Sequence, residues 1–244
     1  MPELNYQNIL IKCVQGIHEK ELQLNVYKNI HNFIARAENY KELASIGRLF
    51  KIDETLKDNF SYKQMTFLYG KLRDSPHART YYEYLLGTSI ECPYCGVHLS
   101  ASLDHYLPKK HYPMYSIDPI NLVPCCSDCN SLKLEHKQLE GEETFHPYFD
   151  KISKNQFLFA KAKEEDNVAF KFYLQKPEDL NENEFLKMSN HFKTLELGEL
   201  YSILASKEIH TQIYELKKLY KLGGAKEVAD WLEENYLTNL NVAV

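Results

Sequence analysis

Residues 92–133, CPYCGVHLSASLDHYLPKKHYPMYSIDPINLVPCCSDCNSLK, decide how the whole chain is interpreted, because chemically specific residues concentrate there. Two Cys-x-x-Cys pairs bracket the stretch, Cys92 with Cys95 and Cys126 with Cys129. Each pair can place two thiolates about 2.3 Å from one tetrahedral Zn²⁺. Four sulfurs close the coordination shell and leave no position for water, so the spacing predicts a structural zinc site.

Prolines interrupt the same stretch and divide it into short apolar pieces, at positions 93, 108, 113, 119 and 124. A loop-rich segment of this kind has little core of its own, and zinc binding would order it. Cys125 could replace Cys126 as a ligand, although Cys126 keeps the two-residue spacer to Cys129. The alternatives are buried free cysteines and thiol redox chemistry, and the βαβ pattern that accompanies redox Cys-x-x-Cys is absent from the sequence.

Further polar elements stand between and after the cysteine pairs. Asp104-His105-Tyr106-Leu107-Pro108-Lys109 comes first, then Asn121-Leu122-Val123-Pro124, and Asn130 and Lys133 follow the last cysteine. Taken in this order with the cysteines, these elements resemble the zinc-containing HNH endonucleases, whose fold is the ββα-metal core. The resemblance covers residues 91–137.

The resemblance implies a role for each matching residue. His105 would be the general base, and Asp104 and Asn130 would be ligands of a catalytic divalent cation. Asn121 would orient the base and its loop. The third letter of the HNH motif is Asn130 here rather than histidine, a family variant that favours a hard ion such as Mg²⁺ or Mn²⁺.

The residue types support the same chemistry without the family. Carboxylate and amide oxygens suit Mg²⁺, and a bound cation stabilises charge on a scissile phosphate. A neutral histidine can accept a proton at neutral pH. Because adjacent residues on a strand point to opposite faces, Asp104 and His105 cannot both face one groove from a regular strand. The opposite projection is useful if Asp104 turns toward the helix that carries Asn130 while His105 faces the phosphate. Lys109 and Lys133 are candidate nucleic-acid contacts.

The flanking sequence is mainly helical, since apolar residues recur at three- and four-residue steps over 5–50, over 60–87 and beyond Pro177. Residues 156–174 alternate around a Glu-Glu-Asp-Asn turn, which predicts a hairpin, and from Ser127 one helix could run to about Gly141. We therefore expect a mainly α protein with a small zinc-bound ββα-metal core and one β-hairpin, an α+β fold. The expected parts are a helical region at 1–90, a nuclease core at 91–150 and a partner-docking region at 151–244.

The net charge and the hydropathy pattern limit the classes of partner that this chain is expected to have. The net charge is −5, so no positive field of the whole chain indicates nucleic acid. Residues 141–244 hold 13 basic against 18 acidic side chains, which suits docking to a protein better than gripping phosphate. The sequence has no long apolar run and no secretory signal at its N-terminus, so we expect a cytoplasmic protein without a membrane partner.

The long form of the Asp-His element, with His146-Pro147-Tyr148-Phe149 after it, is similar to standalone bacterial HNH proteins of anti-phage systems, including the Septu-type nuclease partner. The resemblance implies a metal-dependent endonuclease that cuts nucleic acid, DNA by default, as an antiviral effector beside an ATPase. The alternative is a catalytically inactive, zinc-stabilised module that binds nucleic acid or protein. Mg²⁺-dependent nicking by the native chain and by His105→Ala distinguishes the two.

Overall fold

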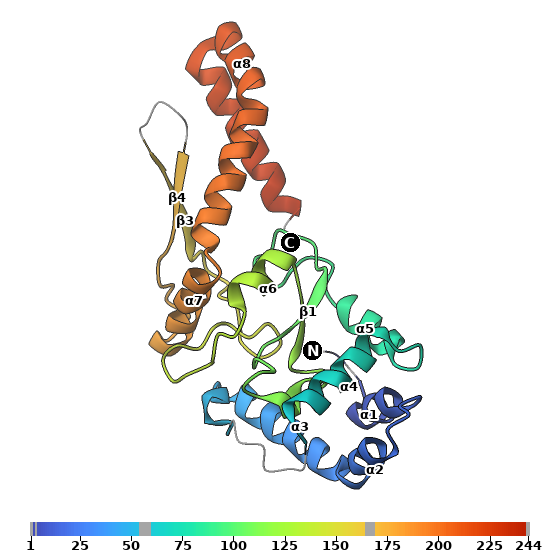
Figure 1. The fold of residues 1–244 in the computed structure, drawn as a ribbon. Helices are drawn as coiled ribbons and strands as arrows, with labels where there is room; N and C mark the ends of the chain where they lie inside the picture. The colour runs from blue at the N-terminus through green and yellow to red at the C-terminus, as the bar shows by residue number, and fades with distance from the viewer. Residues whose placement is uncertain (1, 3, 54–59, 164–168, 243–244) are drawn as a thin grey trace. The chain divides into compact units, whose positions relative to one another are not determined.

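Short amphipathic helices begin the chain in the computed structural model, which describes residues 2, 4–53, 60–163 and 169–242 (Figure 1). They are α1 (Tyr6–Val14), α2 (Lys20–Lys28), α3 (Ile30–Ser45), α4 (Tyr62–Asp74) and α5 (Arg79–Leu86), with a 3-10 turn η1 at Leu49–Lys51. Each of the five helices buries one apolar stripe, as the three- and four-residue steps in the sequence predict. The helical interpretation of 5–50 and 60–87 is therefore confirmed for the described residues.

Helix α4 has well-defined ends, which fixes the residues that it presents to its neighbours. Ser61 Oγ accepts the backbone N–H of Gln64 at 3.3 Å, and the Gln64 side chain accepts the Ser61 N–H at 2.8 Å. This reciprocal capping box satisfies two backbone donors that the first turn of a helix leaves free. The helix stops at Asp74, before Ser75 and Pro76, because the residue before a proline disfavours the helical conformation.

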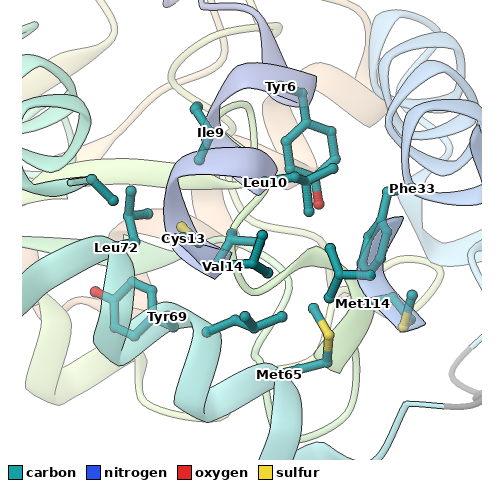
Figure 2. Packing of buried hydrophobic residues seen from close by; sticks show 14 of the residues in the cluster. Tyr6, Ile9, Leu10, Cys13, Val14, Phe33, Met65, Tyr69, Leu72 and Met114 are labelled. Atoms are coloured by element: carbon teal, nitrogen blue, oxygen red, sulfur yellow. The ribbon is translucent and has the colours of Figure 1, made fainter. Parts of the chain in front are cut away.

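The main hydrophobic core joins the helices to the middle of the chain. Leu10 and Val14 of α1, Phe33 of α3 and Met65 of α4 are fully buried in one cluster (Figure 2). The same cluster includes side chains from the loop-rich segment, namely Leu103, Met114, Ile117 and Leu122. Full burial of a large apolar side chain contributes about 1.5–3 kcal/mol, so this cluster attaches the segment to the helices.

A small ββα unit forms in that segment. Strand β1 (Ser102–His105) pairs antiparallel with β2 (Leu122–Cys125), and His105 lies opposite Leu122. The connection contains a short 3-10 turn η2 (Pro113–Tyr115), and α6 (Ser127–Lys133) follows β2 and contacts β1 (Figure 1).

Helix α6 is shorter than the sequence suggested. We expected that it could continue to about Gly141, but it ends at Lys133, and this expectation is wrong. Leu134 has a φ of 41°, and the residues from 135 to 141 form turns and irregular structure, so the backbone leaves the helical region there. A positive φ is unfavourable for a leucine, and local propensity does not predict it.

The described chain forms two compact units, Met1–Phe157 with Lys176–Leu197, and Leu158–Gln175 with Gly198–Val244. The first contains the helices above, the ββα unit and α7 (Glu182–Thr194). The second contains the antiparallel hairpin of β3 (Leu158–Lys163) and β4 (Ala169–Leu174), and all of α8 (Leu197–Val242) except its first residue. The hairpin confirms the alternation over 156–174, while its Glu-Glu-Asp-Asn turn lies outside the described residues.

Helix α8 is two helical legs that meet at Gly224, where the backbone has a φ of 70° (Figure 1). The Gly223-Gly224 pair predicts this interruption, because glycine adopts a positive φ without steric cost. Near its start, the Ser202 hydroxyl donates to the Phe170 carbonyl of β4, and the rings of Phe172 and Tyr201 lie 5.7 Å apart.

The fold class is therefore mainly helical with two small antiparallel sheets, an α+β protein as expected. The described helices include none that is long and apolar enough to span a membrane.

Candidate functional site

The four cysteines of the two pairs come together in the first compact unit. The ligand atoms of Cys92, Cys95, Cys126 and Cys129 all lie within 4.8 Å of one another, and the four residues are buried. A tetrahedral zinc site with Zn–S bonds of about 2.3 Å has sulfur–sulfur edges of roughly 3.8 Å. Because the Sγ atoms of Cys95 and Cys126 lie 4.0 Å apart, the donor set matches a structural metal such as zinc.

Two local structures carry these thiols. In the turn at Cys92–Gly96, the Gly96 N–H donates to the Cys92 carbonyl at 2.8 Å, and Gly96 has a φ of 69°. At the start of α6, Cys126 is the N-cap residue, and its Sγ accepts the Cys129 N–H at 3.4 Å. The turn and the helix end thus position two thiols each, as the two-residue spacers predict.

The position of Cys125 at the end of β2 decides which of Cys125 and Cys126 belongs to the four-cysteine cluster. Cys126 belongs to the cluster, whereas the Cys125 Sγ lies 3.8 Å from the Ser102 hydroxyl, across the β1–β2 pair. Burial raises the pKa of Cys125 to about 12, so this thiol stays protonated at neutral pH. Adjacent residues leave an extended backbone in opposite directions, which separates the two sulfurs.

Asp104 faces α6, and His105 faces the other side of the strand, so the two are opposed as strand alternation requires. Its Oδ2 accepts a hydrogen bond from the Tyr94 hydroxyl at 2.8 Å and pairs with the Lys133 ammonium at 2.8 Å. The side chains of Asp104 and Lys133 are only 4% and 2% exposed. A buried carboxylate needs this kind of pairing, because an isolated buried charge costs several kcal/mol.

Asn130 lies on the same side of β1. Its amide nitrogen donates to the Ser102 hydroxyl at 3.1 Å, and Ser102 stands two residues before Asp104 on the strand. Asp104 and Asn130 thus offer a carboxylate and an amide, whose oxygens are the ligand types that Mg²⁺ and Mn²⁺ prefer.

His105 points away from α6, toward α4 and the β1–β2 connection. Its Nε2 lies 2.9 Å from the Ser116 carbonyl, and its ring centroid lies 4.5 Å from that of Tyr69. A carbonyl only accepts, so Nε2 carries the proton and Nδ1 holds the free lone pair when the ring is neutral. Burial, assisted by the positive charge of Lys109, lowers the pKa of His105 to about 4, and the imidazole is neutral at pH 7.

Asn121 closes the loop after β1. Its Oδ1 accepts the Leu107 N–H at 2.7 Å, and its Nδ2 donates to the carbonyls of Leu107 and Tyr115 at 3.1 Å each. Leu107 follows His105 by two residues, and Tyr115 precedes Ser116, which holds the imidazole. Asn121 therefore connects the two backbone segments that flank His105.

The two lysines differ. The Lys109 Nζ lies 5.0 Å from the centroid of Tyr69, and its side chain is partly exposed. The Lys133 ammonium bonds to Asp104 and donates to the carbonyls of His105 and Tyr106 at 2.8 and 3.0 Å. All three protons of the ammonium are therefore bonded inside the protein. The expectation that Lys133 contacts nucleic acid is corrected, because this side chain is an internal cation.

Sequence reasoning missed three residues that hold the site. Tyr94 contacts Asp104 from within the first cysteine turn, Tyr69 packs on His105 from α4, and the Ser116 carbonyl fixes the tautomer. Tyr94 could have been noticed, because it stands between two predicted zinc ligands. Tyr69 and Ser116 carry no local signal, since their roles depend on chain segments that only folding brings together.

Comparison with known proteins finds a viral relative. The Ea31 protein of Escherichia phage lambda is 31% identical over 240 residues, a match that covers 91% of this chain and 80% of that protein. No family model and no solved structure matches the chain.

Proposed function

The chain belongs to the same family as the Ea31 protein of phage lambda, and we propose that it is a metal-dependent HNH endonuclease. In this proposal it hydrolyses phosphodiester bonds of nucleic acid, with DNA as the favoured substrate. The observation that carries the proposal is the end of β1, where Asp104 turns to α6 and the next residue, His105, turns to the opposite side. The end of β1 thus has the oxygen ligands Asp104 and Asn130 on one side and the neutral imidazole of His105 on the other. A phosphate group bound at this end of the strand could contact both sides.

His105 is the proposed general base. The hydrogen bond from Nε2 to Ser116 leaves Nδ1 as the acceptor, and the low pKa keeps the ring neutral. In hydrolysis Nδ1 would take a proton from the attacking water, whose oxygen forms the new bond to phosphorus as the bond to the leaving oxygen breaks. General-base catalysis of this kind contributes about 10²- to 10⁴-fold to the rate.

Asp104 and Asn130 are the residues that would hold the catalytic cation. Bound Mg²⁺ or Mn²⁺ supplies a Lewis acid that stabilises negative charge on the phosphate and the leaving oxygen. The chain itself prepares the ligands, because Lys133 and Tyr94 hold one carboxylate oxygen of Asp104 and Ser102 holds the Asn130 amide. Lys109, close to His105, is the proposed phosphate contact.

The direct test is plasmid nicking by the purified full chain with Mg²⁺, in the native form and as His105→Ala. We expect the substitution to lower the rate at least about 100-fold, because the proton acceptor is lost. His18→Ala is the matched control, since His18 is exposed on the connection between α1 and α2. Equal nicking by native protein and His105→Ala would contradict the assignment.

The buried Asp104–Lys133 pair favours a second candidate, a zinc-stabilised module that binds nucleic acid or protein without cutting. In that case the lysine serves as the permanent cation of Asp104 and the pair only holds β1 against α6. The two candidates differ in one measurement. A native chain that binds a labelled duplex but shows no Mg²⁺- or Mn²⁺-dependent cleavage, like His105→Ala, would support the binding module.

An antiviral role beside an ATPase stays a prediction from the sequence resemblance. The acidic C-terminal part is the proposed docking region. Co-purification of the chain with an ATPase encoded next to it, lost on removal of residues 198–244, is the expected result.

A further inference from the structure

Two buried polar side chains of the first unit have no part in the function proposed above. Tyr40 of α3 is 0% exposed and His146 is 2% exposed. The Tyr40 hydroxyl lies 3.0 Å from the His146 Nε2, although the residues are 106 positions apart in the sequence. The centroids of these two rings are 6.1 Å apart with the rings nearly perpendicular, and the centroid of the Tyr106 ring lies 3.9 Å from that of the imidazole.

The direction of the hydrogen bonds follows from one backbone donor. The Tyr148 N–H donates to the His146 Nδ1 at 3.2 Å, so Nδ1 is the acceptor. A neutral imidazole then carries its proton on Nε2, which donates to the Tyr40 oxygen. The Tyr40 hydroxyl proton is therefore free to point elsewhere, and it donates to the Asn121 Oδ1 at 3.1 Å.

Burial agrees with this assignment, because it lowers the pKa of His146 well below its usual value, with the charges of Lys133 and Lys187 adding to the effect. A protonated ring would place a donor on Nδ1 opposite the Tyr148 N–H, which the buried site disfavours.

The hydroxyl of Tyr40 fixes which way the Asn121 amide faces. Its Oδ1 accepts from Tyr40 and from the Leu107 N–H, while its Nδ2 donates to two carbonyls. If the amide rotated by half a turn, its NH₂ group would meet two donors and its oxygen would meet two acceptors. All hydrogen-bonding groups of the amide are thus satisfied in one orientation only.

We propose that Tyr40 and His146 are positioning residues for the proposed nuclease reaction and act on His105 through Asn121. This inference rests on the proposed function and adds two residues, from α3 and from the His146–Phe149 segment, to the machinery around the base. Tyr40, His146 and Asn121 form one brace, called here the asparagine brace. It holds both backbone segments that flank the base: Leu107 directly, and Ser116 through its neighbour Tyr115.

Tyr40→Phe tests the brace, because it removes the hydroxyl and keeps the ring that packs near Tyr115 at 5.4 Å and Phe149 at 6.3 Å. Tyr6→Phe is the matched control. The Tyr6 hydroxyl is also buried, and no hydrogen-bond partner for it occurs among the described residues. Both variants lose one core hydroxyl, but only one touches Asn121.

Two readouts separate positioning from stability. With Tyr40→Phe we expect faster hydrogen exchange of the Leu107 amide, and kcat for nicking at least about tenfold lower with KM within about twofold. With Tyr6→Phe we expect both quantities to match the native chain. Unchanged Leu107 exchange in Tyr40→Phe overturns the brace, and so does faster exchange with an unchanged kcat.

The exchange readout also separates the brace from the proposed function. If the native chain does not cut, the nuclease proposal fails and the brace no longer serves that reaction. Leu107 exchange that is faster in Tyr40→Phe than in Tyr6→Phe then still supports the brace as the device that orders the His105 loop, and equal exchange overturns it.

Discussion

The helical layer at residues 6–86 and the segment at residues 91–150 share one compact unit but bury different chemistry. Among the described side chains of the layer, Ser75 is the one polar residue, tyrosines apart, that is buried. The segment buries ionisable and amide groups in number, including Asp104, Asp118, Asn121, Lys133 and His146. The layer is thus stabilised by apolar packing, whereas the segment depends on thiols, ion pairs and directed hydrogen bonds.

The contrast between the two regions shows that apolar packing and buried polar interactions serve different purposes. Apolar packing tolerates small shifts of side chains, but hydrogen-bonded polar groups hold definite orientations because a buried unpaired donor or acceptor costs about 1–3 kcal/mol. The segment that carries the proposed site therefore gains precision from its buried polar groups. Three substitutions test this contrast, in order of expected effect.

Loss of the metal should have the largest effect, because structural zinc sites contribute on the order of 10–16 kcal/mol of binding free energy. We expect Cys126→Ser to abolish zinc binding and to lower the melting temperature strongly. Cys125→Ser should keep a full equivalent of zinc, because its thiol lies outside the cluster. Elemental analysis of the purified chains and thermal melts with and without a chelator measure both. Zinc loss from both variants alike would contradict the assignment of the ligands.

Lys133→Met should come next, because it leaves Asp104 buried without its cation while keeping the length of the side chain. We expect a loss of about 3–5 kcal/mol in the free energy of unfolding. Lys110→Met is the control, since the Lys110 side chain is 57% exposed in its pair with Glu135 and should contribute about 1 kcal/mol or less. Urea unfolding of both variants measures the contrast. Equal losses would show that the buried pair holds β1 no better than a surface pair.

Asp118→Asn should have the smallest effect and the opposite sign. Asp118 is 1% exposed, its Oδ1 accepts the Ile120 N–H at 3.1 Å, and no partner of its Oδ2 occurs among the described residues. Burial raises its pKa from 3.8 to about 7. The folded chain therefore keeps a proton that the unfolded chain releases, and stability falls as the pH rises from about 4 to 7.

The asparagine variant has no charge to bury, so it should be more stable than the native chain at pH 8, by on the order of 1–3 kcal/mol. At pH 4 the two chains should be nearly equal. Urea unfolding at both pH values provides the measurement. A gain that is the same at pH 4 and pH 8 would mean that the native carboxyl is not protonated on folding.

Local patterns predicted much of this molecule correctly. The Cys-x-x-Cys spacers predicted two pairs of neighbouring thiols, because two residues separate ligands by one turn whatever the rest of the chain does, and the fold brings the two pairs together. Strand alternation placed Asp104 and His105 on opposite faces of β1, and the structure shows that Asp104 is the one that faces α6. The end of α6 was missed, because Leu134 takes a positive φ that its side chain does not favour.

The sequence predicted the element on which a residue lies better than it predicted the groups that its side chain contacts. Lys133 follows Asn130 by three residues on α6, and helical spacing places it near β1 without telling whether its ammonium faces protein or solvent. Tyr40 and His146 belong to segments whose composition explains neither their burial nor their contact with Asn121.

The sequence by itself determined the element types, the two Cys-x-x-Cys pairs and the order of the residues at the proposed site, because these depend on spacing along a backbone with regular periods. Only the tertiary structure decided that Cys126 and not Cys125 joins the cluster, that Lys133 neutralises Asp104, and that Tyr40 and His146 orient Asn121. Such partners are selected by burial, since a polar group removed from water must find a hydrogen bond or an opposite charge wherever packing provides it.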